Sequence, residues 1–526
     1  MKKLTLIEQV MAARMASVPL LKIVTTDPAP VIAAIHAELS KKKHPVLRWD
    51  VCSGILGVKD PESEEAALLV NLAGADPSEA SPPAIATGNP VEALQKAVQF
   101  APSQTMLIML NGGMFASGSN DNDSWKPVAQ AIWNCRDEFK SSDRTLVLIG
   151  DDFRLPGPLK SDVIELVDPV PTREDIAGIV RKMCSVAKVE VSEEDVTAAV
   201  ECLAGILSQF LCENIVAMSF RKMGGKWAMD FDFLWSQAIS AIERTSGLKV
   251  IKPTTKWSDI IGLESAKAGL QERNNGPLKP VLVVLMDEVD AQFSGVGTDT
   301  SGTSTDAYGH LLTEVNDNGW SGVVYVGIGG TGKTELAKAM GCEADGLFVS
   351  WDSGAMKDKF VGQSEQMVRN ATTILKARGG EKVFFVCTTN NIQGIPYAFL
   401  RRMEEIAYFK VPIPKETLDA GWSYWMKKFE VPEQPTPDCN NWTIGEIRKC
   451  CRRNWSNRKP DGSRFTLMES AKYIVPVFVS MGADAEKMGK NAHNKYLDAS
   501  KPGLYQHKEK ISVAAVSTRK LATGNN

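Results

Sequence analysis

The order of two short motifs constrains this chain more than any other feature of its sequence. Residues 281–288 form an apolar run that ends in Asp287 and Glu288, as buried parallel strands do at the carboxyl edge of a sheet. Residues 327–334 read Gly-Ile-Gly-Gly-Thr-Gly-Lys-Thr and fit the phosphate-binding P-loop pattern at every fixed position. P-loop proteins usually carry the acidic strand after the glycine-rich loop. The sequence therefore predicts a nucleotide site whose strands are connected in an unusual order.

The P-loop string has the local context that phosphate binding requires. It follows a short β-rich run and precedes a stretch with a helical pattern, so the loop joins a strand to a helix. Glycines let backbone N–H groups converge on phosphate oxygens, and the helix N-terminus adds positive potential. Lys333 is predicted to reach the β- and γ-phosphates, and Thr334 and Asp287 to hold Mg²⁺. Glu288 would polarise the attacking water, so the expected cofactors are ATP and Mg²⁺.

The composition is that of a globular protein with a large core. The chain has 526 residues, of which 44% are hydrophobic and 23% charged, and its formal net charge is −3. This length predicts about two to four domains, and the charge gives no support for a general polyanion binder. No apolar run approaches the length of a membrane span, and Arg14 interrupts any signal-peptide core. We therefore expect a cytoplasmic protein with no membrane partner, and five histidines without ligand spacing favour no metal beyond Mg²⁺.

Changes in pattern along the chain predict four segments. The first alternates strand-like and helix-like stretches, with buried strands expected at Leu20–Thr25, Thr105–Leu110 and Thr145–Ile149. A polar stretch at 252–256 marks the start of the part that holds both motifs, and a loop rich in Ser, Thr, Gly and Asp is expected over 294–306. The segments are residues 1–246, an α/β module with helices; 247–413, the nucleotide-binding core; 414–500, a helical lid; and 501–526, a C-terminal arm.

Further strings resemble one family, the AAA subgroup of P-loop ATPases. Residues 257–264 resemble the segment that leads into the family's core, whose backbone and apolar side chains pack on adenine. Residues 383–390 resemble the sensor-1 strand, with Asn390 at the sensing position. Residues 399–405 resemble the segment that supplies arginine fingers to a neighbouring subunit. The resemblance implies Arg402 as the principal finger and Arg401 as its companion.

Two more strings extend the resemblance to the pore and the lid. Residues 359–362 are similar to the family's first pore loop, and residues 442–447 to the start of the lid helix that faces the nucleotide. The predicted pore-loop residues are Lys359, Phe360, Val361 and Gly362. The residues expected to contact ATP are Gly327, Ile328, Gly329, Gly330, Thr331, Gly332, Lys333, Thr334 and Glu335 of the P-loop, Asp259, Ile260, Ile261 and Gly262 of the leading segment, and Gly445 of the lid.

The resemblance implies a parallel P-loop sheet with altered connections. In the family the spatial order of the strands is 5-1-4-3-2, where strand 1 precedes the P-loop and strand 3 carries the acidic pair. Moving strand 3 to the front of the chain changes the connections but not the neighbours, because the new crossovers can still be right-handed with a helix available. The site at the carboxyl ends of strands 1 and 3 can therefore form unchanged.

The first segment resembles a degenerate copy of the same module. It is similar to the front module of a cyanobacterial and plastid AAA family in which an inactive module precedes an active one. Residues 105–110 would be its acidic strand, but Asn111, Gly112 and Gly113 replace the acidic pair, and the segment has no P-loop. We expect it not to hydrolyse ATP. An unrelated α/β adaptor is the alternative.

These features favour an ATP-driven homo-oligomeric ring, expected to be a hexamer, that remodels or threads a protein substrate. The aromatic Phe360 supports this hypothesis, because an aromatic side chain on a ring axis can grip an extended polypeptide. A DNA- or RNA-directed motor and a nucleotide-gated assembly factor that threads nothing are the alternatives.

Residues 448–464 carry a cluster of basic side chains. Such a run contacts nucleic acid or nucleotide phosphate in some proteins, but more often it is a solvated helix face whose aliphatic stems pack downward. We favour the solvated face. The cluster consists of Arg448, Lys449, Arg452, Arg453, Arg458, Lys459 and Arg464.

Overall fold

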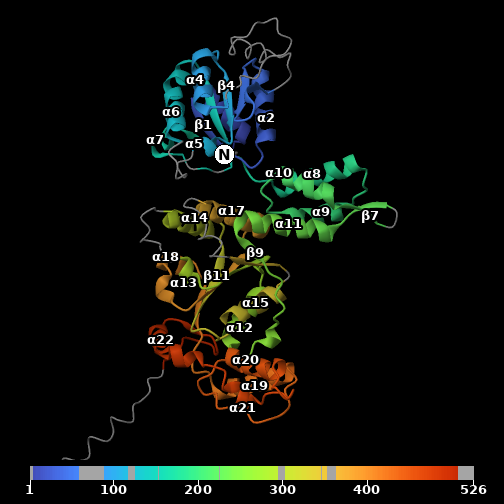
Figure 1. The fold of residues 1–526 in the computed structure, drawn as a ribbon, viewed down its shortest axis with the longest axis vertical. Helices are drawn as coiled ribbons and strands as arrows, with labels where there is room; N and C mark the ends of the chain where they lie inside the picture. The colour runs from blue at the N-terminus through green and yellow to red at the C-terminus, as the bar shows by residue number, and fades with distance from the viewer. Residues whose placement is uncertain are drawn as a thin grey trace, which may run out of the picture. The chain divides into compact units, whose positions relative to one another are not determined.

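The computed structural model describes residues 4–507 except 59–87, 117–124, 152, 154, 224–225, 294–302, 345 and 352–362. The chain divides into two compact units, of which the first holds residues 1–241 and the second begins at Ile242 (Figure 1). The predicted pore loop and the part of the predicted C-terminal arm beyond residue 507 lie outside the described residues.

A six-stranded sheet forms the centre of the first unit, in the order β3-β2-β4-β5-β1-β6. Its strands are β1 (Leu20–Val24), β2 (Val46–Asp50), β3 (Gly54–Gly57), β4 (Met106–Leu110), β5 (Thr145–Gly150) and β6 (Ile164–Val167). All neighbours are parallel except β2 and β3. The three predicted strands are confirmed as β1, β4 and β5, and their continuous apolar runs suit strands that are covered on both faces.

Helices cover both faces of this sheet. α1 (Leu6–Met15) and α2 (Pro28–Ser40) pack on the face that carries Ile23 and Ile149. α4 (Pro90–Phe100) and α6 (Trp125–Ser141) pack on the opposite face, with Leu107 and Leu148. The short helices α5 (Gly112–Ala116) and α7 (Gly157–Lys160) complete this layer.

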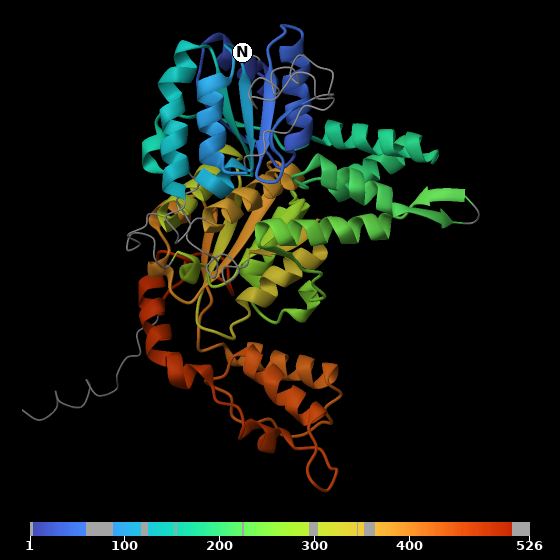
Figure 2. The same cartoon turned by 45° about the horizontal axis from the view of Figure 1, so that its top comes forward.

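A helical part follows the sheet in the first unit. α8 (Arg173–Ala187) and α9 (Glu193–Leu203) each begin at a capping box, formed by Thr172 with Asp175 and by Ser192 with Asp195. α10 (Gln209–Ser219) and α11 (Phe231–Ser246) complete it. Figure 2 shows the hairpin of β7 (Phe220–Met223) and β8 (Lys226–Met229) projecting from these helices.

The second unit is built on a seven-stranded sheet in the order β15-β14-β11-β13-β10-β12-β9. All described neighbours are parallel except β9 and β12. The strands are β9 (Leu248–Val250), β10 (Leu282–Met286), β11 (Ser321–Val326), β12 (Leu347–Trp351), β13 (Val383–Thr389), β14 (Glu405–Tyr408) and β15 (Leu497–Asp498). The predicted order 5-1-4-3-2 is confirmed as β14-β11-β13-β10-β12. The edge strands β9 and β15 were not predicted.

The two sheets place five strands in the same spatial order. In the first unit that order is β6-β1-β5-β4-β2, which corresponds strand by strand to β14-β11-β13-β10-β12 in the second. The chain visits them differently: β4 follows β1 and β2, whereas its counterpart β10 precedes β11 and β12. The acidic strand of the second unit thus occupies the same place in the sheet through different connections.

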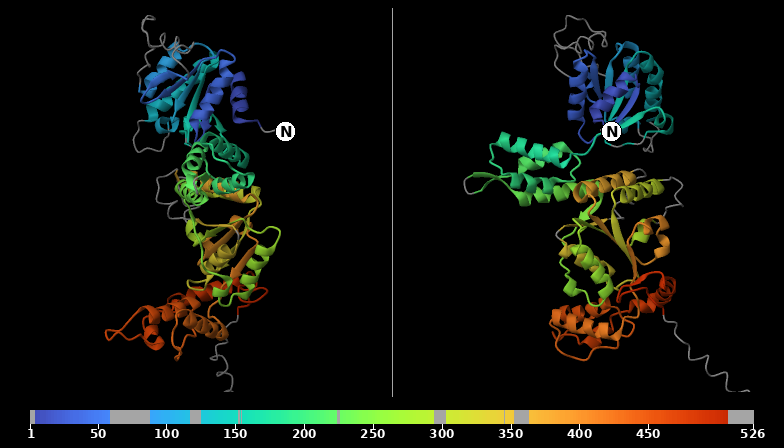
Figure 3. Two further views of the ribbon diagram at one scale, coloured as in Figure 1. Left: turned by 90° about the vertical axis from the view of Figure 1, so that its right-hand side faces the viewer. Right: turned by 180° about the vertical axis from the view of Figure 1, so that it is seen from behind.

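Helices of the second unit hold the sheet and carry the site. α12 (Glu264–Asn275) and α15 (Lys333–Glu343) pack together on one face, over Val283, Tyr325 and Phe384 (Figure 1). α14 (Thr303–Asp317) and α17 (Gln363–Gly379) lie side by side, where His310 hydrogen-bonds Thr372 (Figure 3). The short elements are η1 (Trp257–Asp259), α13 (Val289–Gln292), η2 (Ile392–Gly394) and α18 (Tyr397–Leu400), and the lid comprises α19 (Lys415–Lys428), α20 (Ile444–Ser456), α21 (Leu467–Ala471) and α22 (Val477–Ala492).

One predicted boundary is wrong. α14 begins at Thr303, so residues 303–306 are helical and do not belong to the loop expected over 294–306. Ser, Thr and Asp favour the first turn of a helix as well as loops, because their side chains can bond free backbone N–H groups. Composition alone could not separate the two states here.

Candidate nucleotide site

The P-loop joins β11 to α15 through a backbone that only glycine adopts readily. Gly330 has a φ of +79° and Gly332, the residue that caps α15, a φ of +96°. A Cβ on Gly330 would lie 2.8 Å from the hydroxyl oxygen of Thr443, which belongs to the lid. The glycine-rich loop therefore runs close beneath the start of the lid helix α20. That places its backbone N–H groups at the N-terminus of α15, where an anion is favoured.

Lys333 is folded back into this loop. Its Nζ donates to the carbonyl oxygens of Gly327 at 2.7 Å and Ile328 at 2.9 Å, and lies 3.3 Å from Oδ1 of Asn390. Burial lowers the pKa of the Lys333 ammonium to about 8, although the carboxylates of Asp287, Asp290 and Glu288 partly offset this. A buried ammonium bonded only to neutral groups is suited to an anionic ligand, because a phosphate would stabilise its charged form.

Asp287 meets the P-loop helix across the sheet. Its Oδ1 accepts a hydrogen bond from the Thr334 hydroxyl at 3.0 Å and another from the hydroxyl of Thr388. A carboxylate and a hydroxyl that converge in this way fit Mg²⁺, which prefers oxygen ligands and is held in such sites together with substrate phosphates. No group of three or more His, Cys, Asp or Glu side chains that could hold a metal occurs among the described residues. Phosphate oxygens would therefore have to complete the coordination.

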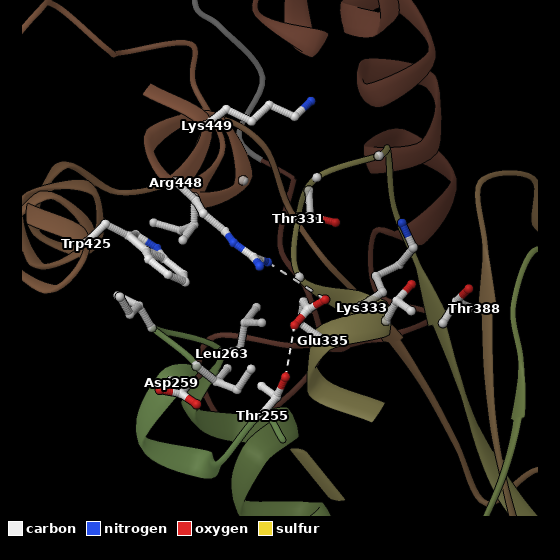
Figure 4. Close-up of a pocket in the computed structure, with 18 of the residues that line it drawn as sticks. Thr255, Asp259, Leu263, Thr331, Lys333, Glu335, Thr388, Trp425, Arg448 and Lys449 are labelled. Atoms are coloured by element: carbon white, nitrogen blue, oxygen red, sulfur yellow. Dashed lines mark hydrogen bonds and ion pairs between the residues drawn. The ribbon is translucent and has the colours of Figure 1, made fainter. Parts of the chain in front are cut away.

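The predicted residues surround one cavity of about 730 Å³ between the P-loop, the leading segment and the lid (Figure 4). Most of the predicted ATP-contacting residues line it. Of the predicted site residues that the structure describes, five do not line the cavity: Gly262, Gly327, Ile328, Arg401 and Arg402. The lining residues that the sequence predicted are Asp259, Ile260, Ile261, Asp287, Glu288, Gly329, Gly330, Thr331, Gly332, Lys333, Thr334, Glu335, Asn390 and Gly445.

Two glycines outside or at the rim of the cavity support its walls. Gly262 has a φ of +70°, and a Cβ there would lie 2.7 Å from Cγ2 of Thr417 in α19. A Cβ on Gly445 would lie 3.1 Å from the carbonyl oxygen of Gly330. Both positions bring the lid close to the core, where a larger residue would force the two apart.

Asp259 ties the leading segment to the lid. Its Oδ1 accepts hydrogen bonds from the Tyr424 hydroxyl and, at 2.9 Å, from Nζ of Lys428. Burial alone would raise the pKa of Asp259, but the backbone N–H of Lys256 and these two partners lower it to about 2. The carboxylate is therefore charged and fixed by α19, which suits a structural bridge at the cavity wall.

Several lining residues were missed from the sequence. The lid helices contribute Trp425 and Lys428 from α19, and Arg448, Lys449 and Arg452 from α20. The Arg448 guanidinium lies 4.0 Å from a carboxylate oxygen of Glu335 and 5.1 Å from the centre of the Trp425 ring (Figure 4). Arg448, Lys449 and Arg452 are exposed, as the interpretation of the cluster as a solvated face predicts, and they also line the cavity.

The two predicted finger residues lie apart from this cavity. They follow α18, where Nη1 of Arg402 donates to the carbonyl oxygen of Ala398 and Arg401 is exposed. Neither side chain lines the cavity of its own chain. This placement is compatible with a role toward another subunit, which stays a prediction.

Comparisons with known proteins find the same family in both units. The family model described as "SpoVK-like AAA ATPase, N-terminal domain" matches residues 6–167. The model described as "ATPase family associated with various cellular activities (AAA)" matches residues 323–380. The first match covers the sheet of the first unit, and the second begins at β11 and ends before β13.

Two curated relatives and one solved structure are similar to parts of this chain. The chain is 24% identical over 451 residues to the uncharacterized AAA domain-containing protein ycf46 of Guillardia theta. The matched residues cover 76% of this chain and 81% of the relative. The chain is 34% identical over 119 residues to the protein SUPPRESSOR OF K(+) TRANSPORT GROWTH DEFECT 1 of Arabidopsis thaliana, covering 23% of this chain and 21% of the relative. The crystal structure of the FIGL-1 AAA domain, 17% identical, covers 48% of this chain and 94% of that one with a TM-score of 0.30. In the described part of the chain, no helix has the length and apolar character of a membrane span.

Proposed function

This chain is an AAA-family ATPase, and on that premise we propose that it forms a homo-oligomeric ring, a hexamer, that couples ATP hydrolysis to the remodelling or threading of a protein substrate. The observation that carries the ATPase part is the 3.0 Å contact between Thr334 and Asp287. These residues are 47 positions apart in reversed motif order, and β13 separates their strands. The fold nevertheless brings the hydroxyl and the carboxylate together beside Lys333.

The proposed roles follow from the positions of the side chains. Lys333 would exchange its carbonyl partners for β- and γ-phosphate oxygens, and Asn390, 3.3 Å from its Nζ, would face the same phosphate. Thr334 and Asp287 would hold Mg²⁺, which neutralises developing charge when bound. Glu288 lines the cavity beside Asp287 and would orient the attacking water.

Arg448 is proposed to bind the phosphate end from the lid. Its guanidinium faces Glu335, which also accepts hydrogen bonds from Thr255 at 3.1 Å and Lys338 at 3.0 Å. Because Glu335 keeps two other donors, Arg448 can leave it for a phosphate without stranding the carboxylate. The lid would then close on the bound nucleotide.

We infer that the motif order is a rearrangement of the family's order. Two observations support this. The AAA family match stops at residue 380, where the family's order would continue into the acidic strand. The first unit also carries the same sheet order with its strands in the family's sequence.

The ring and the protein substrate rest on two sets of residues outside the cavity. Arg401 and Arg402 do not line the cavity of their own chain, and we propose that they complete the site of a neighbouring subunit. Lys359, Phe360, Val361 and Gly362 fall between β12 and α17, as the family's pore loop does. An aromatic side chain there would grip a polypeptide in the channel.

The pore-loop assignment predicts a separation of two activities. Phe360→Ala should leave basal ATP hydrolysis and oligomerisation near normal, because a pore-loop side chain would contact the substrate and not the nucleotide. It should remove stimulation of hydrolysis by an unfolded protein, while Phe360→Tyr keeps a flat ring and retains it. Phosphate release with and without unfolded casein measures both.

A nucleic-acid motor predicts a different result in the same assay. Lys359→Ala would then remove the stimulation, which would come from DNA or RNA and fall steeply with salt. A nucleotide-gated assembly factor would tolerate both substitutions. Either outcome would contradict threading of a protein.

The first unit is proposed to bind no nucleotide, because a carboxylate occupies the corresponding turn. β1 is the counterpart of β11, and the turn into α2 holds Asp27 where the second unit has its P-loop. The Asp27 carboxylate accepts hydrogen bonds from the Ser208 hydroxyl at 2.6 Å and the backbone N–H of Gln209 at 2.5 Å. These donors begin α10 and hold the carboxylate in the turn before α2, so a negative charge stands where a phosphate would otherwise bind.

The chain is expected to bind one ATP at saturation. The Glu288→Gln variant is suited to the measurement, since slow hydrolysis keeps ATP intact during titration. Isothermal titration calorimetry should return a stoichiometry of one ATP per chain. Adding Lys333→Ala to the Glu288→Gln variant should remove the heat of ATP binding. A second ATP per chain, with micromolar affinity that survives Lys333→Ala, would contradict the prediction.

A further inference from the structure

A single buried hydroxyl links both acidic residues of the nucleotide site. Thr388 lies near the end of β13 and is 1% exposed. Its Oγ1 donates to Oδ1 of Asp287 and accepts a hydrogen bond from the backbone N–H of Glu288 at 3.3 Å. A hydroxyl has one proton to donate and lone pairs to accept, so it can serve both partners at once.

Glu288 has a backbone that needs such support. Its φ is +49° and its ψ 50°, a left-handed conformation that non-glycine residues rarely adopt. The bond to Thr388 holds this N–H, and the Glu288 carbonyl accepts from the N–H of Ala291 at 2.9 Å at the start of α13. The direction in which the Glu288 carboxylate leaves the chain depends on these two bonds, since the conformation at Cα sets the side-chain vector.

Asp287 is held from two sides. Thr388 donates to the same Oδ1 that receives the Thr334 hydroxyl at 3.0 Å. Thr334 would exchange that bond for Mg²⁺ when the metal binds, whereas Thr388 comes from a different strand and remains. The carboxylate would therefore keep its orientation through the change.

We propose that Thr388 is a positioning residue that sets the Mg²⁺-binding carboxylate of Asp287 and the water-orienting carboxylate of Glu288 together. The inference rests on the roles proposed above for those two residues. The neighbouring hydroxyl of Thr389 serves a different carboxylate, since it donates to Oδ1 of Asp290 at 2.7 Å. Strand β13 thus presents two threonines to different acidic residues that follow β10, and of the two only Thr388 bonds to Asp287 and Glu288.

Two substitutions at this position test the proposal in the full-length chain. Thr388→Val keeps the branched shape and removes the hydroxyl, and Thr388→Ser keeps the hydroxyl. Binding of a fluorescent ADP analogue is measured with EDTA and with Mg²⁺, beside the kcat for ATP hydrolysis. Thr373→Val, which removes an exposed hydroxyl on α17, is the matched control.

Thr388→Val should bind the analogue in EDTA within about twofold of the unmutated protein, because Lys333 and the P-loop, the groups proposed to hold the phosphates, are unchanged. The gain in affinity on adding Mg²⁺ and the kcat should each fall on the order of tenfold, as expected for loss of a hydrogen bond to a charged group. Thr388→Ser should restore both, and Thr373→Val should change neither.

Three outcomes would overturn the inference. The first is a Thr388→Val variant with normal kcat and normal Mg²⁺ dependence. The second is equal loss of binding with and without Mg²⁺, together with a lowered melting temperature, which indicates a structural role only. The third is a Thr388→Ser variant as impaired as Thr388→Val. If Glu288→Gln hydrolyses ATP at the unmutated rate, the proposed function itself fails, and this result is independent of Thr388.

Discussion

Glu288→Gln is expected to bind ATP normally and to hydrolyse it on the order of 10²-fold or more slowly, because the amide cannot accept a proton from, or orient, the attacking water as a carboxylate does. Lys333→Ala is expected to abolish tight ATP binding. The Lys333 ammonium is buried within the P-loop, and no other lysine of α15 can take its place at the phosphates. The two variants therefore separate binding from chemistry at one site.

Calorimetric titration with a non-hydrolysable ATP analogue measures the binding, and phosphate release measures the rate. Lys338→Ala is the matched control for Lys333→Ala, since Lys338 lies on the same helix and pairs with Glu335 at 3.0 Å. It should change binding little, as expected for a partly exposed ion pair. A Glu288→Gln variant that hydrolyses ATP at the unmutated rate would show that the acidic strand has been assigned to the wrong residues.

The sheet of the second unit could be predicted because each of its central strands carries a strong local signal. Strands β10, β11 and β13 are rich in apolar residues and buried along their whole length, and residues of the site follow directly after each. The backbone geometry of the P-loop itself requires its glycines, so the loop can be predicted from the sequence without knowledge of the fold. The spatial order of the strands could then be predicted, because a change in the connections between strands does not have to change which strands are neighbours.

The parts that could not be predicted depend on where distant elements meet. β15 has two residues, too few for any periodic pattern, and forms only because the chain returns from the lid beside β14. The sequence around Arg448 does not show that this side chain lines the cavity, because that depends on how the lid places α20. Thr388 is one of two adjacent threonines, and only the register of β13 against β10 tells which hydroxyl meets Asp287.

The first unit illustrates the same limit. Its sequence shows the absence of a P-loop and of an acidic pair, which predicts an inactive module. It does not show that Asp27 meets the start of α10, because the two residues that donate to it lie about 180 positions away. The turn after β1 therefore lacks residues that would bind a phosphate, and it also carries a negative charge that would repel one.

Arg402→Ala is expected to reduce ATP hydrolysis by roughly 10³–10⁵-fold, the range measured for arginine fingers in other phosphoryl-transfer systems. The Arg402 side chain does not line the cavity of its own chain, and its Nη1 donates to the carbonyl oxygen of Ala398. As a finger, its guanidinium would turn to the γ-phosphate of a neighbouring subunit, where it would stabilise charge that develops in the transition state. Nucleotide binding should change little, since the finger acts on a site in another chain.

Mixed assemblies distinguish this mechanism from a local defect. Arg402→Ala subunits keep an intact P-loop but offer no finger, whereas Lys333→Ala subunits keep the finger but bind no ATP. Neither alone should hydrolyse ATP, and mixing them should restore part of the activity at interfaces where an intact P-loop faces an intact Arg402. Arg401→Ala, its neighbour in the chain, should have a smaller effect. Activity of the unmutated protein should also rise with its concentration, and full rates from a species that light scattering identifies as a monomer would contradict the ring, because a finger supplied by another subunit cannot act in a single chain.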